Sequence, residues 1–94
     1  MVGMFGQLGL PKGSYIVSGS AKMSTKDAFA TIAIIVDGVS YGETNLFGFK
    51  SFDGNRATTV ALINLDTDKM IYFGAWAESD FEITPLYLKA IKVR

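Results

Sequence analysis

A chain of 94 residues is long enough for one domain with a modest core, so we expect residues 1–94 to form a single domain. It contains no cysteine and no histidine, which excludes disulfides and the usual zinc or copper ligands, and we expect no cofactor and no metal. The nine basic and nine acidic residues are scattered along the chain, which excludes the basic stripe of a nucleic-acid binder.

Hydrophobic residues make up 49% of the chain and charged residues 19%, whereas an ordinary soluble domain has about 25% charged residues. The longest apolar run, residues 32–36, is far too short for a membrane helix, so we expect no membrane insertion. Residues 1–13 lack the basic start and the long apolar centre of a signal peptide. The excess of apolar side chains therefore indicates contact with another protein chain.

Taken in chain order, the sequence alternates between short apolar runs and turn residues. The runs are rich in Ile, Val, Thr, Phe and Tyr, which favour strands, and the breaks contain Asp-Gly and Pro-x-Gly signals. We predict an all-β antiparallel sandwich with breaks at residues 11–13, 24–27, 37–38, 53–55, 66–68 and 78–85. The eight predicted strands lie near residues 2–9, 14–23, 28–36, 39–44, 46–52, 57–65, 69–77 and 86–93.

The predicted strands fall into two kinds. Residues 14–23 alternate between an apolar face and a face of Ser and Lys, which is typical of a strand with one wet side. The runs at 28–36, 57–65, 69–77 and 86–93 are apolar on both sides. A two-layer sandwich has only one inside, so a loop, the amino-terminal segment or another chain must cover the second face. Because few residues lie outside the predicted strands, we favour another chain.

Four segments resemble the jelly roll shared by complement globular heads and tumour necrosis factor. Residues 10–21, LPKGSYIVSGSA, are similar to its Pro-x-Gly-x-Tyr entry into a core strand. Residues 58–65 and 69–76 are similar to the strands around its Leu-x-x-Gly-Asp turn, and residues 87–93 to its final strand. The chain departs from the family in having no Gly in that turn, and it is short enough to have lost one or two outer strands.

The resemblance implies a jelly roll of about eight strands that assembles as a tight homotrimer around an apolar axis and performs no chemistry. Residues 1–10 would form an anchoring or edge segment. On this basis we assign the trimer interface to the side chains of Ile32, Ile34, Val36, Ala61, Ile63, Ile71, Phe73 and Ile91.

The residue types argue against catalysis. Ser-His and Cys-His nucleophile pairs are excluded by composition. Serines at 18, 20 and 24 near Lys22 and Lys26 are typical of a wet strand face. The carboxylates that could act as acid and base, or bind calcium, all lie in predicted turns, where solvation keeps them ordinary. They are Asp66, Asp68, Glu78, Asp80 and Glu82.

These features predict a non-enzymatic, trimeric virion module: a bacteriophage fibre head that binds a receptor, or a capsid decoration protein. The partners would be a host-surface carbohydrate, a protein receptor or other virion proteins. The initial Met and the lack of a stalk favour decoration. The alternative is a stand-alone carbohydrate- or ligand-binding sandwich, with Trp76 stacking on a sugar ring or anchoring an interface. In a fibre head, loops 37–45, 53–56 and 78–85 would hold the receptor site, whereas in a decoration protein residues 2–10 would hold the chain to the shell. We assign partner or receptor contact to Tyr41, Asn45, Asn55, Trp76 and Asp80.

Overall fold

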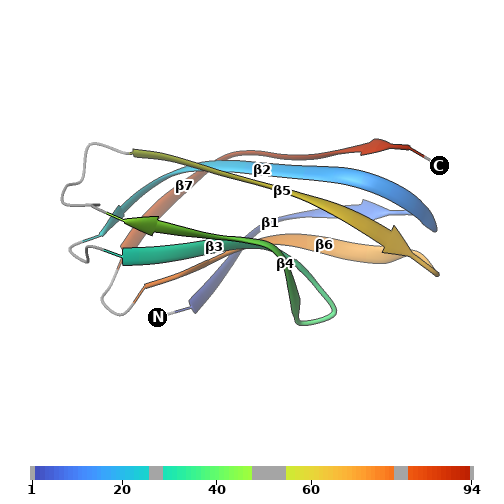
Figure 1. Cartoon of the computed structure of the whole chain (residues 1–94), viewed down its shortest axis with the longest axis horizontal. Coiled ribbons are helices and arrows are strands. Elements are labelled where there is room, and N and C mark those ends of the chain that lie inside the picture. Colours follow the sequence, from blue (N-terminus) through green and yellow to red (C-terminus); the bar gives the residue numbers. More distant parts are fainter. Residues whose placement is uncertain (1, 26–28, 48–54, 78–80, 94) are drawn as a thin grey trace.

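The computed structural model describes residues 2–25, 29–47, 55–77 and 81–93, and the regular structure in these ranges is entirely β-strand. Its seven strands all run along the long axis of the molecule (Figure 1). They are β1 (Val2–Leu10), β2 (Gly13–Thr25), β3 (Phe29–Val36), β4 (Val39–Phe47), β5 (Asn55–Leu65), β6 (Lys69–Trp76) and β7 (Phe81–Lys92).

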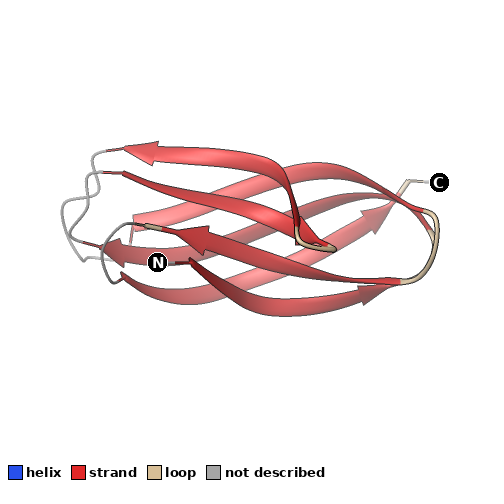
Figure 2. Ribbon diagram, turned by 90° about the horizontal axis from the view of Figure 1, so that it is seen from below, coloured by secondary structure: helices blue, strands red, loops and turns tan. Residues whose placement is uncertain are grey.

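The strands form two antiparallel sheets that lie face to face (Figure 2). One sheet has four strands in the order β1-β6-β3-β4, and the other has three in the order β5-β2-β7. Among the described strands, only β3 and β4 are successive strands of one sheet, and every other connection crosses from one sheet to the other. The prediction of an all-β antiparallel sandwich is therefore confirmed.

Two predicted boundaries are wrong. The strands predicted at 39–44 and 46–52 correspond to the single strand β4, and residues 48–54 lie outside the described residues. The predicted break at 78–85 ends sooner than expected, because β7 already begins at Phe81 and continues through Pro85. Proline is tolerated there because β7 is an edge strand and its register with β2 shifts at this point.

The core lies between the sheets and follows the alternation of the strands. The face of β2 that was predicted to be apolar is buried, including Tyr15, Val17 and Met23. Gly19 of β2 faces Phe73 of β6 across the core, and a Cβ at Gly19 would lie 2.9 Å from the Phe73 ring. Phe73 is the largest fully buried side chain, so this glycine makes room for its ring.

The predicted tight turn between β3 and β4 is present. Asp37 and Gly38 have φ angles of 52° and 77°, the two positive values of a type I′ hairpin turn, and Val36 pairs with Val39 across it. At the opposite end of β6 from Trp76, the backbone N–H of Lys12 donates to Asp68 Oδ1 at 2.9 Å. This bond ties the β1–β2 turn to the β5–β6 turn, so the predicted turn carboxylate Asp68 has a structural role.

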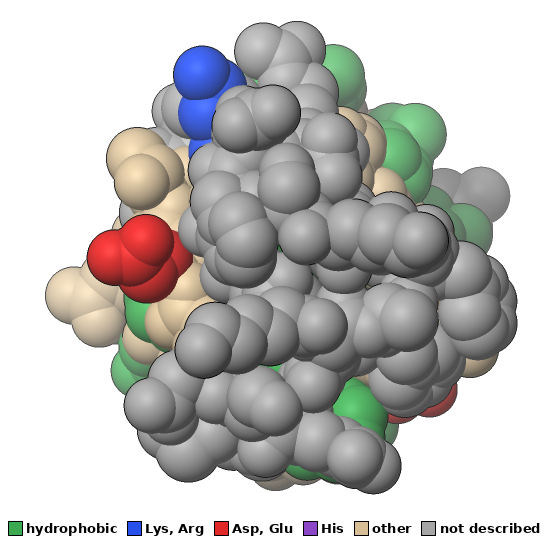
Figure 3. Space-filling view, turned by 90° about the vertical axis from the view of Figure 1, so that its left-hand side faces the viewer, with side chains coloured by type: hydrophobic (Ala, Val, Ile, Leu, Met, Phe, Trp, Pro, Cys, Tyr) green, Lys and Arg blue, Asp and Glu red, His purple; other side chains and the backbone are tan. Residues whose placement is uncertain are grey.

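The two long sides of the sandwich differ. On the β4/β5 side, Gly42 of β4 has a φ of 62° and its carbonyl accepts hydrogen bonds from the Thr59 hydroxyl and, at 3.1 Å, the Thr44 hydroxyl. These contacts close that side. On the β1/β7 side the packing is looser: the Phe5 and Phe81 rings meet edge to face at 6.0 Å, and both remain partly exposed. Seen end-on, hydrophobic side chains (green) reach the rim of the molecule (Figure 3).

Candidate functional site

The outer surface of the three-stranded sheet carries most of the large hydrophobic side chains that are exposed. Of the ten in the described residues, six lie on this surface. We call these six residues the apolar face: Ile16, Val60, Leu62, Tyr87, Ile91 and Val93.

Strand register aligns the centre of the apolar face into one row. Ile16 of β2 pairs with Leu62 of β5 on one side and with Ile91 of β7 on the other. Leu62 and Ile91 are 63% and 62% exposed, the highest values among the large hydrophobic residues. Covering such a side chain gives roughly 1.5–3 kcal/mol, so a row of three favours association strongly.

The apolar face occupies only one end of this sheet surface. Further along β2, Ser18 is half-buried beside Val60, Ser20 is fully buried beside Tyr87, and Lys22 is exposed. The Lys89 ammonium lies 5.0 Å from the centre of the Tyr87 ring, where the ring's negative face attracts it. The surface therefore changes from apolar, near the β5–β6 turn, to polar.

The structure places seven of the eight residues assigned to the trimer interface inside the sandwich. Because these seven are at most 8% exposed and pack within the core, they are not available to a second copy of this fold. They are Ile32, Ile34, Val36, Ala61, Ile63, Ile71 and Phe73. Ile91 alone of the assigned set is exposed. On β3, β5 and β6 the sequence assignment therefore chose the side chains of the inward-pointing face.

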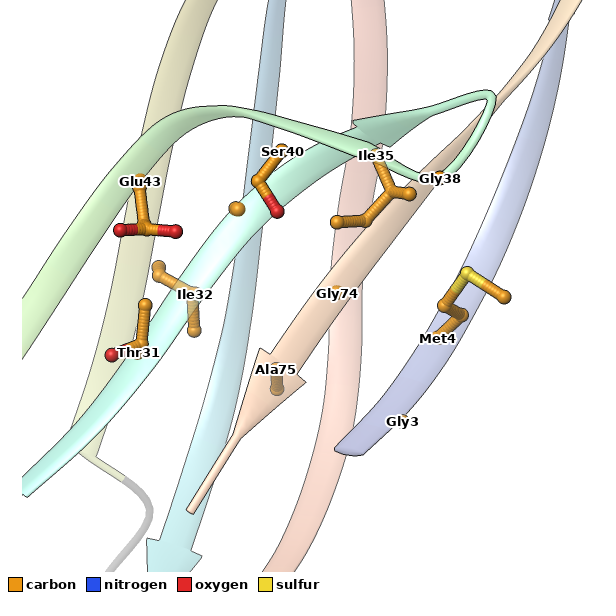
Figure 4. Close-up of a pocket in the computed structure, with 11 residues that line it drawn as sticks. Gly3, Met4, Thr31, Ile32, Ile35, Gly38, Ser40, Glu43, Gly74 and Ala75 are labelled. Carbon is orange, nitrogen blue, oxygen red and sulfur yellow. The ribbon is translucent and has the colours of Figure 1, made fainter. Parts of the chain in front are cut away.

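The outer surface of the four-stranded sheet has a hollow of about 280 Å³ (Figure 4). Its lining includes Gly74 of β6 and Ala33 of β3, which are both buried, and the side chain of Ile35, which lies over Gly74. Met4 of β1 lies on one side and Glu43 of β4 with Thr31 of β3 on the other, as Figure 4 shows. The hollow combines an apolar floor with polar groups at its rim, which suits a small amphipathic ligand.

Register places aromatic residues on both sides of this hollow. Met4 pairs with Gly74, and Gly74 with Ala33, so these three form one row across the sheet. The adjacent rows on the outer surface carry Trp76 and Tyr72 of the same strand, β6. Both rings are half-buried, so each presents part of its surface to solvent.

Of the five predicted contact residues, the structure describes the side chains of Tyr41, Asn45 and Trp76, and it does not bring these three together at one site. Asn45 is exposed on β4 and accepts a hydrogen bond from Thr31 at 3.0 Å, in the same row as Trp76. Tyr41 is exposed nearer the hairpin and lines a second hollow of about 400 Å³. Asn55 begins β5, and Asp80 lies outside the described residues. Of the three with described side chains, only Trp76 and Asn45 therefore share a surface region.

The second hollow is lined by the hairpin and by the β5–β6 turn. At its rim, Lys69 Nζ lies 2.8 Å from Asp37 Oδ2. Hydrogen bonding and charge attraction from Asp37 raise the pKa of Lys69 above its ordinary value. The pair is on the surface, where such bridges stabilise little, and it ties the hairpin to β6 without creating a reactive group.

The residues considered for chemistry are dispersed. Within the ranges that the structure describes, no three acidic side chains converge on a point that could hold a metal ion. Asp66 and Glu82 are exposed on different elements, while Glu78 and Asp80 lie outside the described residues. Ser18 and Lys22 belong to the outer side of β2, as expected.

Comparisons with protein-family models, with curated proteins and with solved structures find no match for this chain. The described residues contain no helix with the length and apolar character needed to cross a membrane. Two surface features of the sandwich therefore bear on its function: the apolar face on the three-stranded sheet and the hollow on the four-stranded sheet.

Proposed function

We propose that this protein is a non-enzymatic structural module that works by assembling into a homotrimer through the apolar face. The observation that carries the proposal is the cross-strand row of Leu62, Ile16 and Ile91, which leaves three large aliphatic side chains in water in the single chain. Monomeric proteins rarely expose a continuous apolar patch of this kind, and a partner surface would remove it from water.

We further propose that the sandwich is a jelly roll reduced to seven strands. Two features support this. The chain crosses between the sheets at every connection except the β3–β4 hairpin, and non-consecutive strands are neighbours in both sheets, as in a double Greek key. The sequence resemblance to complement and tumour-necrosis-factor heads is the basis for expecting three copies rather than two.

The context we propose is a virion, as a fibre head or as a capsid decoration protein. The basis is the sequence: a cysteine-free, weakly charged chain with the resemblance described above. In both roles the apolar face would hold the copies together, and the opposite sheet would face the partner. The hollow on that sheet would be the contact region of a fibre head.

Replacing Leu62 with Lys tests the trimer. We expect the wild-type protein to scatter light as a particle of about 31 kDa, three times 10.2 kDa. Leu62→Lys is expected to scatter as a monomer with a preserved β-sheet circular-dichroism spectrum, because the new charge lies outside the core. Val39→Lys is the matched control, since Val39 is 51% exposed on the hairpin and lies off the apolar face. A wild-type monomer at micromolar concentration would contradict the proposal.

A second candidate function, sugar binding, is favoured by the hollow and its flanking Trp76. Apolar surfaces and aromatic rings suit the C–H faces of a sugar ring, and the oxygens of Glu43 and Ser40 would accept hydrogen bonds donated by its hydroxyl groups. Trp76 is the only tryptophan, so its fluorescence reports on this site alone. We expect saturable changes in emission with simple hexoses at roughly millimolar concentration, weakened in Glu43→Gln. Unchanged Trp76 emission at sugar concentrations far above the millimolar range would exclude this candidate.

A further inference from the structure

The sandwich is incompletely covered along one long side. Seven hydrophobic residues pack against the core while remaining partly exposed, and all of them come from β1 and β7. On β7 they include Phe81, Ile83, Leu88 and Ala90. Among the side chains that the structure describes, none from β4 or β5 belongs to this group, so these partly exposed core contacts lie on the β1/β7 side.

The unequal numbers of strands in the two sheets explain why these residues are partly exposed. The sheet that contains β1 has four strands and the sheet that contains β7 has three, so the smaller sheet ends before it covers its partner. In the described residues β7 pairs with β2 on one side and with no strand on the other. A further strand beside β7 would equalise the sheets and cover the half-buried residues.

The backbone of β7 also points outward at defined positions. The Val93 N–H donates to the Ser14 carbonyl at 2.8 Å, which identifies Ser14 and Val93 as a hydrogen-bonded pair. In an antiparallel ladder such pairs alternate with pairs whose N–H and C=O groups point away from each other. Counting back along the register, Leu88, Ala90 and Lys92 direct their peptide groups away from β2.

The charged side chains of β7 indicate which kind of segment can pair with its open edge. The stretch of β7 from Tyr87 to Lys92 carries two cations, Lys89 and Lys92, and no carboxylate. Lys89 lies on the outer face of β7 and Lys92 on the other face. Antiparallel pairing with β7 of a second copy therefore sets like lysines opposite one another in the registers that pair Lys89 with Lys89 or Lys92 with Lys92, which is destabilising. A segment with outward-pointing carboxylates between its inward-pointing apolar residues would instead complement Lys89.

We infer that the free edge of β7 accepts an extended segment of another polypeptide, with apolar side chains at alternate positions and Asp or Glu between them. The segment pairs with the backbone of Leu88, Ala90 and Lys92, and its apolar side chains cover the β1/β7 side of the core. This inference names a partner for the proposed assembly module, but it does not depend on the trimer, which uses the outer surface of the sheet rather than its edge.

The test uses a capped eight-residue peptide that alternates Val with Glu and Thr. We expect it to bind the whole protein saturably, as measured by calorimetry, and to bind more weakly as salt rises. Two control peptides are matched to it: one has Lys in place of Glu, and the other has N-methyl groups on alternate residues, which remove the backbone donors. Equal binding of all three peptides, or no binding of the first, would overturn the inference.

Proline substitutions in β7 separate edge pairing from folding. Ala90→Pro removes an N–H that points to the open edge, so we expect it to leave the melting temperature nearly unchanged and to weaken peptide binding about tenfold or more. Lys89→Pro removes an N–H that pairs with β2, so we expect it to lower the melting temperature by roughly 5–10 °C. Undiminished peptide binding by Ala90→Pro would overturn the inference.

Hydrogen exchange distinguishes a free edge from one covered by a second copy. Without peptide, the amides of Leu88 and Ala90 are expected to exchange much faster than those of Lys89 and Ile91, and to become protected when the peptide binds. Equal protection of all four amides without peptide would mean that the edge is already paired, and would overturn the inference. The mass of Leu62→Lys tests the trimer separately, so the two proposals can fail independently.

Discussion

Phe73→Ala is expected to lower the free energy of unfolding by about 3–5 kcal/mol, the largest effect of any single truncation in this chain. The Phe73 ring is fully buried and belongs to the core cluster that also contains Met23, Ile32 and Ala75. Removing it deletes apolar contacts from both sheets and leaves a cavity that strands held in two ladders cannot readily close. Chemical denaturation followed by circular dichroism measures the effect.

A double mutant tests whether the Phe73 ring requires a glycine at position 19. Gly19→Ala alone is expected to cost about 1–3 kcal/mol, because the added Cβ would lie 2.9 Å from the ring. With Phe73→Leu the space is free, so Gly19→Ala should cost clearly less in that background than in the wild type. Additive effects of the two changes would contradict the close approach.

The same experiment separates a core role from the interface role that the sequence predicted for Phe73. If Phe73 lies in the core, Phe73→Ala unfolds more easily at every protein concentration. If it lay at a trimer axis, the variant would dissociate into folded subunits, and the loss of stability would shrink as the protein concentration rises. Denaturation at two concentrations tenfold apart decides between them.

The sequence predicted the strands well because their ends carry strong local signals. The Asp37-Gly38 turn needs two positive φ angles, which few other residue pairs adopt, and it ends β3 within one residue of the prediction. The face of β2 was also predicted correctly, because Ser and Lys alternate there with apolar residues. Local chemistry decides such features, so a single sequence reveals them.

The inward face of β5 could not be predicted in this way. Val60 and Leu62 alternate with Ala61 and Ile63, and hydropathy alone cannot say which pair points inward. Pairing with β2 decides it: Ile63 lies opposite the core residue Tyr15, and Leu62 lies opposite the exposed Ile16. Val60 and Leu62 were therefore missed as site residues, although the two-faced pattern of β5 was the signal that pointed to them. Ile16, Tyr87 and Val93 were missed as well, so Ile91 is the one member of the apolar face that the sequence assigned.

Long-range pairing also explains the wrong boundary at Pro85. A proline next to acidic residues is typical of a loop, and the prediction treated it as one. In the fold, Pro85 lies on an edge strand where the ladder with β2 is already irregular, so its missing N–H breaks no essential bond. Which strand forms an edge depends on the whole topology, which no local pattern contains.

Gly42→Ala is expected to lower the free energy of unfolding by about 2–5 kcal/mol, which is the second large effect after that of Phe73→Ala. Gly42 has a φ of 62°, which costs a residue with a Cβ about 1–2 kcal/mol. In addition, a Cβ there would lie 2.6 Å from the backbone oxygen of Val60. Backbone cannot move aside as a flexible side chain can, so β4 and β5 would have to separate, and the hydrogen bond from Thr59 to the Gly42 carbonyl would be lost.

Gly38→Ala is the matched control for this prediction. Gly38 has a similar positive φ of 77°, but no atom lies within 4 Å of the position of its Cβ. It should therefore show the backbone cost alone, and the difference between the two variants measures the close approach of β4 to β5. Equal losses, measured by denaturation at 25 °C, would mean that this side of the sandwich is not closed by Gly42. The β4/β5 side would then resemble the more loosely packed β1/β7 side.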